Sequence, residues 1–199
     1  MTIAFNPLPV TLEGRAVRLE KLAAHHAEDL FLAGRDEGIW RYMPCPPPSS
    51  VEDIQGLINK ALEEQAAGRE IPFAIIDRVT SRAVGSTRYL DIQREHSALE
   101  IGWTWLAKAH QRTRVNTECK YLLLRHAFEQ LGAIRVQLKT DSRNLRSQRA
   151  IERLGAVREG TLRRHKRLWD GYVRDTVYYS ILNSEWPGLK QRLEALLQH

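Results

Sequence analysis

Apolar and polar residues alternate over several short stretches of the chain, and this spacing places successive side chains on opposite faces of a β-strand. The stretches with this pattern, or with a short apolar run, are 14–20, 71–77, 83–92, 98–106 and 133–140. Residues 156–182 predict two longer strands joined at Asp170 and Gly171, a pair suited to a two-residue hairpin turn. The chain is therefore expected to build a sheet.

In two of these strands, the alternation predicts which side chains face the core. In 98–106, the apolar face is expected to hold Leu99, Ile101, Trp103 and Trp105. The opposite face of that strand then holds Glu100, Gly102 and Thr104. In 133–140, the side chains expected to point inward are Ile134, Val136 and Leu138, with Arg135, Gln137 and Lys139 outward.

Helical spacing of apolar residues predicts four helices between the strands. They cover 24–40, about 50–68, 115–131 and 144–154, and Ser49 or Ser50 is expected to cap the second. Gly132 and Gly155 follow the last two helices, where glycine commonly ends a helix. The order is β-α-α-β-β-β-α-β-α-β-β, which predicts one α+β domain over residues 1–199 with mixed α/β layers. Its mixed, mostly antiparallel sheet needs a helical crossover from 98–106 to 133–140.

Composition narrows the class of protein only a little. The chain has 199 residues, of which 43% are hydrophobic, and no apolar run approaches the roughly 18–20 residues of a membrane span. Cys45 and Cys119 lie far apart and in no ligand spacing, so we expect no disulfide framework, no metal site and a cytoplasmic location. The net charge of +6 leaves an anionic partner open, although a soluble enzyme with a basic surface fits equally well.

The segment from His110 to Thr117 joins the strand 98–106 to the helix that follows it, and it is rich in arginine. The first turn of a helix leaves backbone N–H groups unpaired and carries a partial positive charge, so such a loop can hold a phosphate. Arg112 and Arg114 add charge nearby. The alternative is an ordinary helix entrance, capped by Asn116 or Thr117, with solvated arginines.

Three motifs resemble those of the GNAT (GCN5-related N-acetyltransferase) family, in particular its ribosomal-protein N-terminal acetyltransferase-like branch. They are 100-EIGWTWL-106, 111-QRTRVN-116 and 144-NLRSQRAIERLGA-156. The resemblance covers nearly the whole chain, and it implies an acyl-CoA N-acyltransferase fold and acetyl-CoA as co-substrate. The family's phosphate loop reads Gln/Arg-x-x-Gly-x-Gly/Ala, but Arg114 and Asn116 stand at the two small positions here. A left-handed conformation at either would cost on the order of 1–2 kcal/mol.

The resemblance assigns roles in cofactor binding. It implies that backbone amides of the loop hold the pyrophosphate of coenzyme A, through Gln111, Arg112, Thr113, Arg114, Val115, Asn116 and Thr117. It further implies that the backbone at Trp105 and Leu106 pairs with pantetheine and the acetyl carbonyl, and that Asn144 binds the cofactor arm. Without the family, Asn144 is simply a helix cap.

The resemblance also assigns the chemistry. Glu100 matches an acidic position that serves as general base in this branch, whereas a solvated or arginine-paired glutamate is the alternative. Ser147 lies where this branch places a general acid. Many members of the family use a tyrosine one turn further along, and that position is Ile151 here, so the proton for the thiolate is expected from Ser147 or water. Because no nucleophile–histidine arrangement is legible, we expect direct attack in a ternary complex.

The acceptor is expected to be a primary amine, either the α-amine of a protein N-terminus, with a ribosomal protein as one candidate, or a small molecule. Residues expected at the acceptor site are Trp40, Tyr42, Trp103 and His165. The basic run 163–167 is either a solvated face or a rim that attracts an acidic partner. No nucleic-acid motif is present, so nucleic acid is not expected as a partner, and neither is a membrane. A homodimer is left open, and the rival function is a non-catalytic acyl-CoA-binding regulatory or partner-binding protein.

Overall fold

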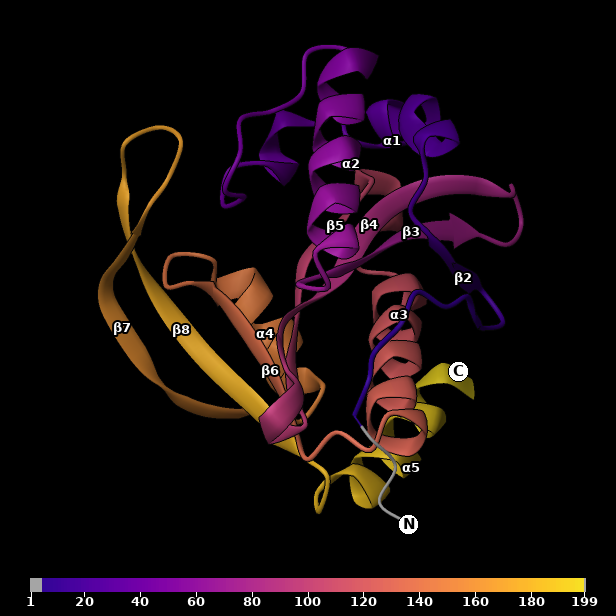
Figure 1. Ribbon diagram of the computed structural model, residues 1–199, viewed down its shortest axis with the longest axis vertical. Coiled ribbons are helices and arrows are strands. Elements are labelled where there is room, and N and C mark those ends of the chain that lie inside the picture. Colours follow the sequence, from indigo (N-terminus) through magenta and orange to yellow (C-terminus); the bar gives the residue numbers. More distant parts are fainter. Residues whose placement is uncertain (1–4, 199) are drawn as a thin grey trace.

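The computed structural model describes residues 5–198, which form one eight-stranded sheet with helices against both faces (Figure 1). The strands are β1 (Leu12–Glu13), β2 (Val17–Lys21), β3 (Ile71–Asp77), β4 (Arg82–Gln93), β5 (Ala98–Leu106), β6 (Arg135–Asp141), β7 (Val157–Arg167) and β8 (Val173–Leu182). The helices are α1 (Ala27–Ala33), α2 (Val51–Ala66), α3 (Arg114–Arg125), α4 (Leu145–Arg153) and α5 (Trp186–Gln198). A π-helical turn, His126–Gln130, continues α3.

The sheet has the mixed, mostly antiparallel topology that the sequence predicted. Its strands lie in the order β1-β2-β3-β4-β5-β6-β8-β7. All neighbours are antiparallel except β5 and β6, and α3 makes the crossover between them. This α+β arrangement of helices on a central sheet is the expected fold class.

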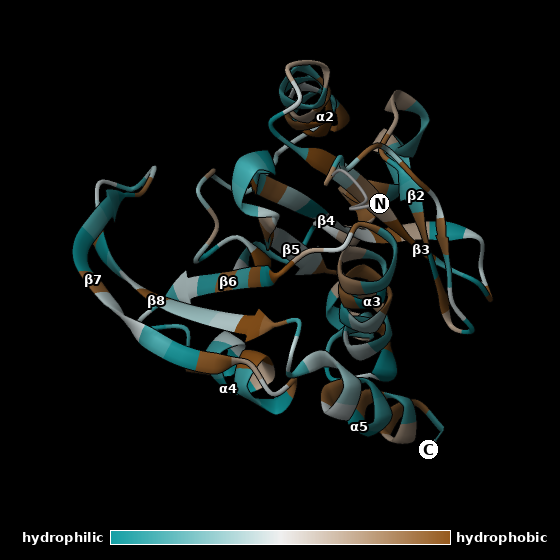
Figure 2. Cartoon of the chain, turned by 60° about the horizontal axis from the view of Figure 1, so that its bottom comes forward, coloured by the Kyte–Doolittle hydropathy of each residue, from teal (hydrophilic) through white to brown (hydrophobic). Residues whose placement is uncertain are grey.

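Two apolar clusters flank the sheet. Helices α1 and α2 pack on one face over a cluster that includes Leu30, Trp40 and Ile58. Helices α3 and α5 pack on the other face over a larger cluster that includes Leu122 and Val136. Figure 2 shows the hydrophilic edge strand β7, whose residues are mostly exposed. No helix within residues 5–198 combines the length and the apolar character that crossing a membrane requires.

The structure corrects three expectations about the elements. Residues 24–40 do not form one helix, because α1 ends before Gly34 and separate 3-10 turns lie at 24–26 and 37–39. The β7–β8 hairpin has a three-residue loop, since Leu168 N–H donates to Tyr172 O and Gly171 takes the left-handed angle φ 83°. Ile134 precedes β6 and is 52% exposed instead of pointing inward.

Helix α5 is the one long element that the sequence analysis did not predict. Its buried side chains are Trp186, Leu189 and Leu193, which have helical spacing. The helix packs against α3, and the Trp186 indole N–H donates to Glu129 at 2.9 Å. The signal was therefore present in the sequence.

Glu118 on α3 ties this helix to the turn before β2. Its carboxylate accepts backbone N–H bonds from Arg15 (2.7 Å), Ala16 (2.7 Å) and Val17 (2.9 Å). The turn approaches so closely that a Cβ on Gly14 would lie 2.8 Å from the Glu118 carboxyl carbon. One buried acid therefore fixes the position of the helix that borders the cavity described below.

We predict that Glu118→Ala lowers the free energy of unfolding by about 2–4 kcal/mol, because three backbone donors lose a charged acceptor. Urea unfolding measures the change. Glu95→Ala, in an exposed turn at 94–96, is the matched control. A loss no larger than that of the control would contradict the assigned role.

Candidate active site

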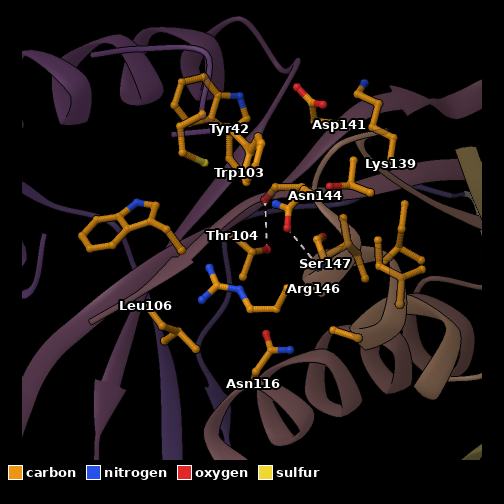
Figure 3. Close-up of a pocket in the computed structure, with 18 of the residues that line it drawn as sticks. Tyr42, Trp103, Thr104, Leu106, Asn116, Lys139, Asp141, Asn144, Arg146 and Ser147 are labelled. Carbon is orange, nitrogen blue, oxygen red and sulfur yellow. Dashed lines mark hydrogen bonds between the residues drawn. The ribbon is translucent and has the colours of Figure 1, made fainter. Parts of the chain in front are cut away.

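Strands β5 and β6 pair along only part of their length. Their parallel register covers Ala98–Glu100 opposite Arg135–Gln137, and beyond it the strands diverge. A cavity of about 510 Å³ lies there, bordered by the free edge of β5, the end of β6, α4 and the start of α3. Figure 3 shows Tyr42, Trp103, Lys139 and Asp141 toward one end of the pocket and Asn116 at the other. The separated strands thus expose backbone N–H and C=O groups to a binding site.

A β-bulge at Trp103 sets which side chains enter the cavity. In the β4–β5 register Arg88 pairs with Gly102 and Ser86 with Trp105, so one extra residue stands on β5. Trp103 takes the left-handed angle φ 50°, and its ring lies 4.3 Å from the Arg88 guanidinium carbon. This conformation is costly for a tryptophan and marks a locally strained backbone.

The bulge overturns the predicted faces of this strand. Leu99 and Ile101 pack in the cluster beneath α3, whereas Trp105 packs in the cluster beneath α1 and α2. Thr104 does not share a face with Glu100, since its hydroxyl contacts Lys120 of α3. Simple alternation fails here because the extra residue reverses the direction of every side chain after it.

The loop before α3 is a helix N-terminus that can receive an anion. Thr113 is the N-cap, and its Oγ1 accepts from Val115 N–H at 3.2 Å; neither Asn116 nor Thr117 caps the helix. Within the described residues, the amide N–H groups of Arg112, Thr113, Arg114 and Asn116 donate to no protein acceptor. No acidic residue lies in the first turn. The free donors and the helix dipole together favour a bound phosphate.

The left-handed backbone angle considered for Arg114 and Asn116 occurs at another residue of this loop. Arg114 and Asn116 belong to α3 and have ordinary right-handed angles. The left-handed residue is Arg112, at φ 61°. The departure from small residues therefore imposes no backbone strain at either predicted position, and the amides still point out of the helix end.

Arginines surround this end of the cavity. Arg112, Arg146, Arg149 and Arg153 line it. The Gln111 amide bridges the loop to β5 and α4, because it donates to Leu106 O at 3.0 Å and accepts from Arg146 at 2.6 Å. The sequence analysis did not single out the three arginines of α4, which look like an ordinary solvated helix face.

Helix α4 begins at the cavity. Asn144 is its N-cap, with Oδ1 accepting the Ser147 N–H at 3.0 Å, and both residues line the cavity. Ile151 lies one turn beyond Ser147 and also lines it. The asparagine therefore has the capping role that its sequence position suggested, and its side-chain oxygen is already engaged.

Glu100 lies at the opposite end and is only 1% exposed. Its Oε2 accepts from Lys139 at 2.6 Å and from Gln137 at 2.9 Å, so two donors on β6 hold the carboxylate in place. The ion pair is with a lysine, not the arginine considered as the alternative. Glu100 lines the cavity although its side chain is almost fully buried.

Asp141 and Arg143 form a second, peripheral ion pair. The guanidinium donates to Asp141 through Nε (3.0 Å) and Nη2 (2.8 Å) and lies 3.4 Å from the centre of the Tyr172 ring. Burial opposes ionisation of Asp141, but the hydrogen bonds and charge of Arg143 outweigh it and lower its pKa. Asp141 is therefore ionised at neutral pH.

Lys120 is a cavity residue that the sequence analysis missed. It extends from α3, is 6% exposed, and its Nζ donates to Thr104 Oγ1 at 2.5 Å. Burial lowers its pKa to about 8. It fell outside the predicted apolar stripe and gave no signal, because a lysine on a helix is usually solvated.

Five of the predicted site residues lie outside the cavity lining: Trp40, Arg114, Val115, Thr117 and His165. Trp40 is fully buried, packs against Trp105 with the ring centres 5.0 Å apart, and donates to Gly34 O at 2.7 Å. It therefore shapes the core and cannot contact an acceptor directly. Val115 is a core residue, and Thr117 accepts from Arg153. His165 faces Thr176 and Tyr178 on β8.

The remaining predicted residues do line the cavity. They are Glu100, Ser147, Trp105, Leu106, Gln111, Arg112, Thr113, Asn116, Asn144, Tyr42 and Trp103. Burial raises the pKa of both cysteines, Cys45 and Cys119, to about 11, so neither is an activated thiol.

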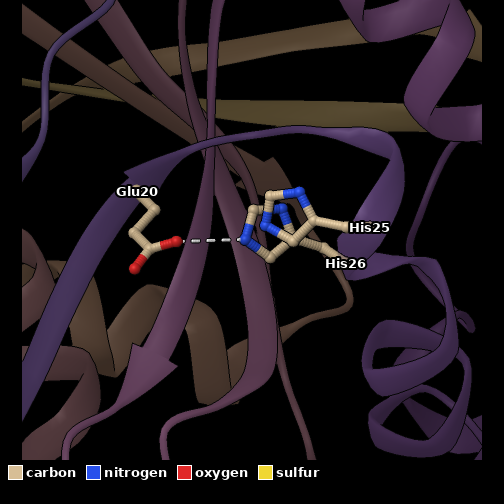
Figure 4. Close-up of side chains that lie close together, drawn as sticks. All are labelled: Glu20, His25 and His26. Carbon is tan, nitrogen blue, oxygen red and sulfur yellow. Dashed lines mark hydrogen bonds and ion pairs between the residues drawn. The ribbon is translucent and has the colours of Figure 1, made fainter.

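A second cluster of chemically capable side chains, Glu20, His25 and His26, lies outside the cavity (Figure 4). Burial lowers the pKa of His26, so its ring is neutral at pH 7. Its Nε2 faces Glu20 at 3.2 Å and its Nδ1 lies 3.1 Å from Ala23 N, so both nitrogens are engaged. Arg18 pairs with the other oxygen of Glu20. The cluster is therefore a local structural contact, and it gives no ground for a metal ion.

The chain is similar to known acetyltransferases over most of its length. The family model of the acetyltransferase (GNAT) domain matches residues 16–157. A GCN5-related N-acetyltransferase from Brucella melitensis superimposes with a TM-score of 0.90 at 31% identity, over 96% of this chain and 86% of that one. Mycobacterium smegmatis RimJ, solved in complex with CoA-disulfide, has a TM-score of 0.83 at 21% identity over 94% of this chain and 95% of that one.

A curated relative, the uncharacterized N-acetyltransferase p20 of Bacillus licheniformis, is 25% identical over 178 residues, 89% of this chain and 99% of that protein. The chain belongs to the GNAT acetyltransferase family and is an acyl-CoA-dependent acetyltransferase. Enzymes with the GNAT fold use acetyl-CoA.

Proposed function

We propose that this enzyme transfers the acetyl group of acetyl-CoA to a primary amine by direct attack in a ternary complex. The observation that carries the proposal is the continuity of two sets of free backbone groups. The edge of β5 at Trp103–Leu106, which has no strand partner on the β6 side, and the unpaired amides at the start of α3 border one cavity. A ligand with a phosphate at one end and an amide-containing arm fits such a site.

The proposed position of acetyl-CoA follows from these groups. The pyrophosphate lies at the amides of residues 112–116, where the surrounding arginines add charge. The pantetheine arm pairs with the free β5 edge at Trp105 and Leu106, as an added strand would. Backbone N–H groups beside the bulge then stabilise the oxyanion that forms on the acetyl carbonyl. Asn144 and Gln111 position the loops around the arm.

Glu100 is the proposed general base for the acceptor amine. It is held by two donors on Oε2, so Oε1 is the atom available to a proton from the amine or from a bridging water. Proton removal is needed because only a neutral amine attacks a thioester. Tyr42 and Trp103, at the same end of the cavity, are proposed to border the acceptor.

The proposed attack is direct, without an acyl-enzyme. Both cysteines have raised pKa values, and buried Cys119 packs in the core. Ser147 lines the cavity, and its hydroxyl is the proton donor implied by the family resemblance. The proposed acceptor is either the α-amine of a protein N-terminus, such as that of a ribosomal protein, or a small-molecule amine. The rival is a non-catalytic acyl-CoA-binding protein on the same fold.

We predict that Asn116→Asp weakens acetyl-CoA binding about tenfold or more without lowering stability. A carboxylate in the first turn of α3 stabilises the helix dipole but repels the phosphate that the same amides would hold. Calorimetry gives the affinity and urea unfolding the stability. Asn59→Asp, exposed on α2, is the isosteric control. Equal affinities for both variants would contradict the phosphate position.

We predict that Glu100→Gln lowers kcat by about 100-fold or more while the Kd of acetyl-CoA changes little, because a general base contributes 10²–10⁴-fold. Thiol release across a panel of amines and peptide N-termini measures turnover. Unchanged turnover would refute the role of Glu100. Binding of acetyl-CoA to the unmodified enzyme with no thiol release on the whole panel would favour the non-catalytic rival.

A further inference from the structure

Two cations at the acceptor end of the cavity have no carboxylate partner. The ionic side chains that line this end are Glu100, Lys139, Asp141, Lys166 and Arg174. Lys139 pairs with Glu100, and Asp141 pairs with Arg143. Within residues 5–198, neither Lys166 nor Arg174 makes an ion pair. The end of the cavity that faces the acceptor therefore carries unbalanced positive charge.

The two cations lie directly opposite each other on neighbouring strands. Lys166 of β7 is the register partner of Arg174 of β8, and like charges in such a pair destabilise a hairpin. Arg174 is 7% exposed and donates through Nε to Thr176 at 3.0 Å. Lys166 is exposed at the rim of the cavity, where desolvation and the positive charges of Lys139 and Arg174 lower its pKa and the charges of Glu100 and Asp91 oppose that shift. An arrangement this unfavourable is stabilised when an anion lies between them.

Coenzyme A does not supply that anion in the proposed complex. Its phosphates lie at the start of α3, whereas Lys166 and Arg174 belong to the β7–β8 hairpin, which Figures 1 and 2 place on the far side of β6 from α3. Among residues 5–198, the carboxylates that line this end, Glu100 and Asp141, already have partners. Asp91, whose charge also acts on Lys166, lies outside the lining and forms no ion pair with it. The missing negative charge must come from the acceptor.

We propose that Lys166 and Arg174 form a subsite for an acidic group on the acceptor, so that the enzyme prefers amines that also carry a carboxylate or a comparable anion. This proposal rests on the proposed function, because it assumes that the amine lies at Glu100. The guanidinium fork of Arg174 suits a planar carboxylate, and the lysine adds a point charge. The excess positive charge also favours the neutral form of the amine that must attack.

Matched pairs of amines test this preference. Glycine, β-alanine and γ-aminobutyrate are each compared with their carboxamides, so that the distance between amine and acid varies while the amine is kept. Calorimetry measures binding to the CoA-loaded enzyme and to the enzyme alone. At the favoured spacing the acid should bind about tenfold tighter than its amide, the size of one charge-assisted contact.

Arg174→Met should remove the preference for the acid over its amide. Lys166→Met should remove it too, and this variant serves as the test if Arg174→Met does not fold. Arg163 is exposed on β7, the strand of Lys166, and lies outside the cavity lining, so Arg163→Met should keep the preference for the acid. Comparing acid-to-amide ratios between variants cancels the different basicities of the amines. CoA binding without any preference for acids would overturn the subsite and leave the proposed function standing. Acid binding that depends on Arg174, without CoA binding, would support the subsite and overturn the proposed function.

A separate observation concerns Lys120. This lysine lies one helical turn after Asn116 on the same face of α3, and its Nζ reaches Thr104, which follows the bulge on β5. It is therefore positioned between the proposed phosphate site and the acetyl carbonyl, along the path of the pantetheine arm. Thr104 is a neutral partner, and among residues 5–198 no carboxylate lies in hydrogen-bonding distance of this buried ammonium.

We infer that Lys120, in place of the Ser147 hydroxyl that the family resemblance implies, gives its proton to the sulfur of coenzyme A when the thioester breaks; this assignment also rests on the proposed function of acetyl transfer. The acceptor nitrogen forms the new bond to the acetyl carbon, and the electron pair of the C–S bond passes to sulfur. Sulfur takes a proton from Nζ, and the proton that the acceptor amine loses to Glu100 returns to Lys120 through solvent. One proton thus moves in total from the amine to the thiol.

The acidity of Lys120 suits this step. Burial is the largest effect and lowers its pKa to about 8, while the charges of Cys119 and Glu100 oppose that shift. Below pH 8 the amine is protonated and can donate, and a thiol has an ordinary pKa near 8.5. Proton transfer between groups of matched pKa has little energetic cost. A serine hydroxyl is a far weaker acid.

Bound coenzyme A itself reports on this contact, without any acceptor. An ammonium beside the thiol favours the thiolate, so the thiol of bound CoA should ionise at least one pH unit below that of free CoA. The ultraviolet absorbance of the thiolate, taken as the difference from bound desulfo-CoA, measures it. Lys120→Met should abolish the shift, Lys120→Arg should keep it, and Lys60→Met, exposed on α2, should leave it unchanged.

Equal ionisation of the thiol in the unmodified enzyme and in Lys120→Met would overturn the assignment while CoA binding still supported the proposed function. Absence of CoA binding would overturn both. Because a lysine that only supports packing would not alter the titration of a ligand, the measurement separates a proton donor from a structural residue.

Discussion

The early end of the β5–β6 pairing is the constraint on which the site depends. Three residue pairs hold the two parallel strands together, and then the sheet opens. A backbone that parts inside a sheet leaves polar groups that must find other partners. The bulge at Trp103 deepens the opening, because it turns the following residues of β5 and frees their edge. The proposed cofactor binding, the proposed oxyanion stabilisation and the position of Glu100 all depend on this one break in the ladder.

The charges around the cavity divide its length into two parts. Helix α3 begins at one end, where free amides and arginines of α4 offer a site for phosphate. At the other end, among residues 5–198, lie two ion pairs and two cations without an ion-pair partner, and the proposed preference for an acidic acceptor rests on these groups. Lys120 lies between the two ends, where a thiolate would form. Part of the net positive charge of the chain thus lies around this cavity.

Much of the fold was predictable because it rests on periodicity. The strands 71–77 and 98–106 have the predicted bounds, and Ser50 caps α2 as expected. Periodicity failed where a single residue adopts an unusual backbone angle. Trp103 and Arg112 both have positive φ, yet neither is a glycine, so nothing in the sequence marks them.

The site was predictable where a residue acts through its place on an element, and less so where it acts through tertiary contacts. Glu100, Asn144 and the loop residues Gln111, Arg112, Thr113 and Asn116 line the cavity, because the strand 98–106 and the starts of both helices were located to within one residue. Trp40 is buried instead, since its partner Trp105 comes from a strand whose faces the bulge reverses. The proposed roles of Lys120, Lys166 and Arg174 depend on the groups that surround them in space. The spacing of residues along the sequence does not predict those contacts.

Hydrogen exchange of the backbone with and without coenzyme A tests the central claim most directly. If the free edge of β5 and the start of α3 form one binding site, CoA should slow exchange at Trp103–Leu106 and at Arg112–Asn116. The α2 helix, which does not border the cavity, should be unaffected. Protection confined to the β7–β8 hairpin or to α2, with both segments unchanged, would contradict the account.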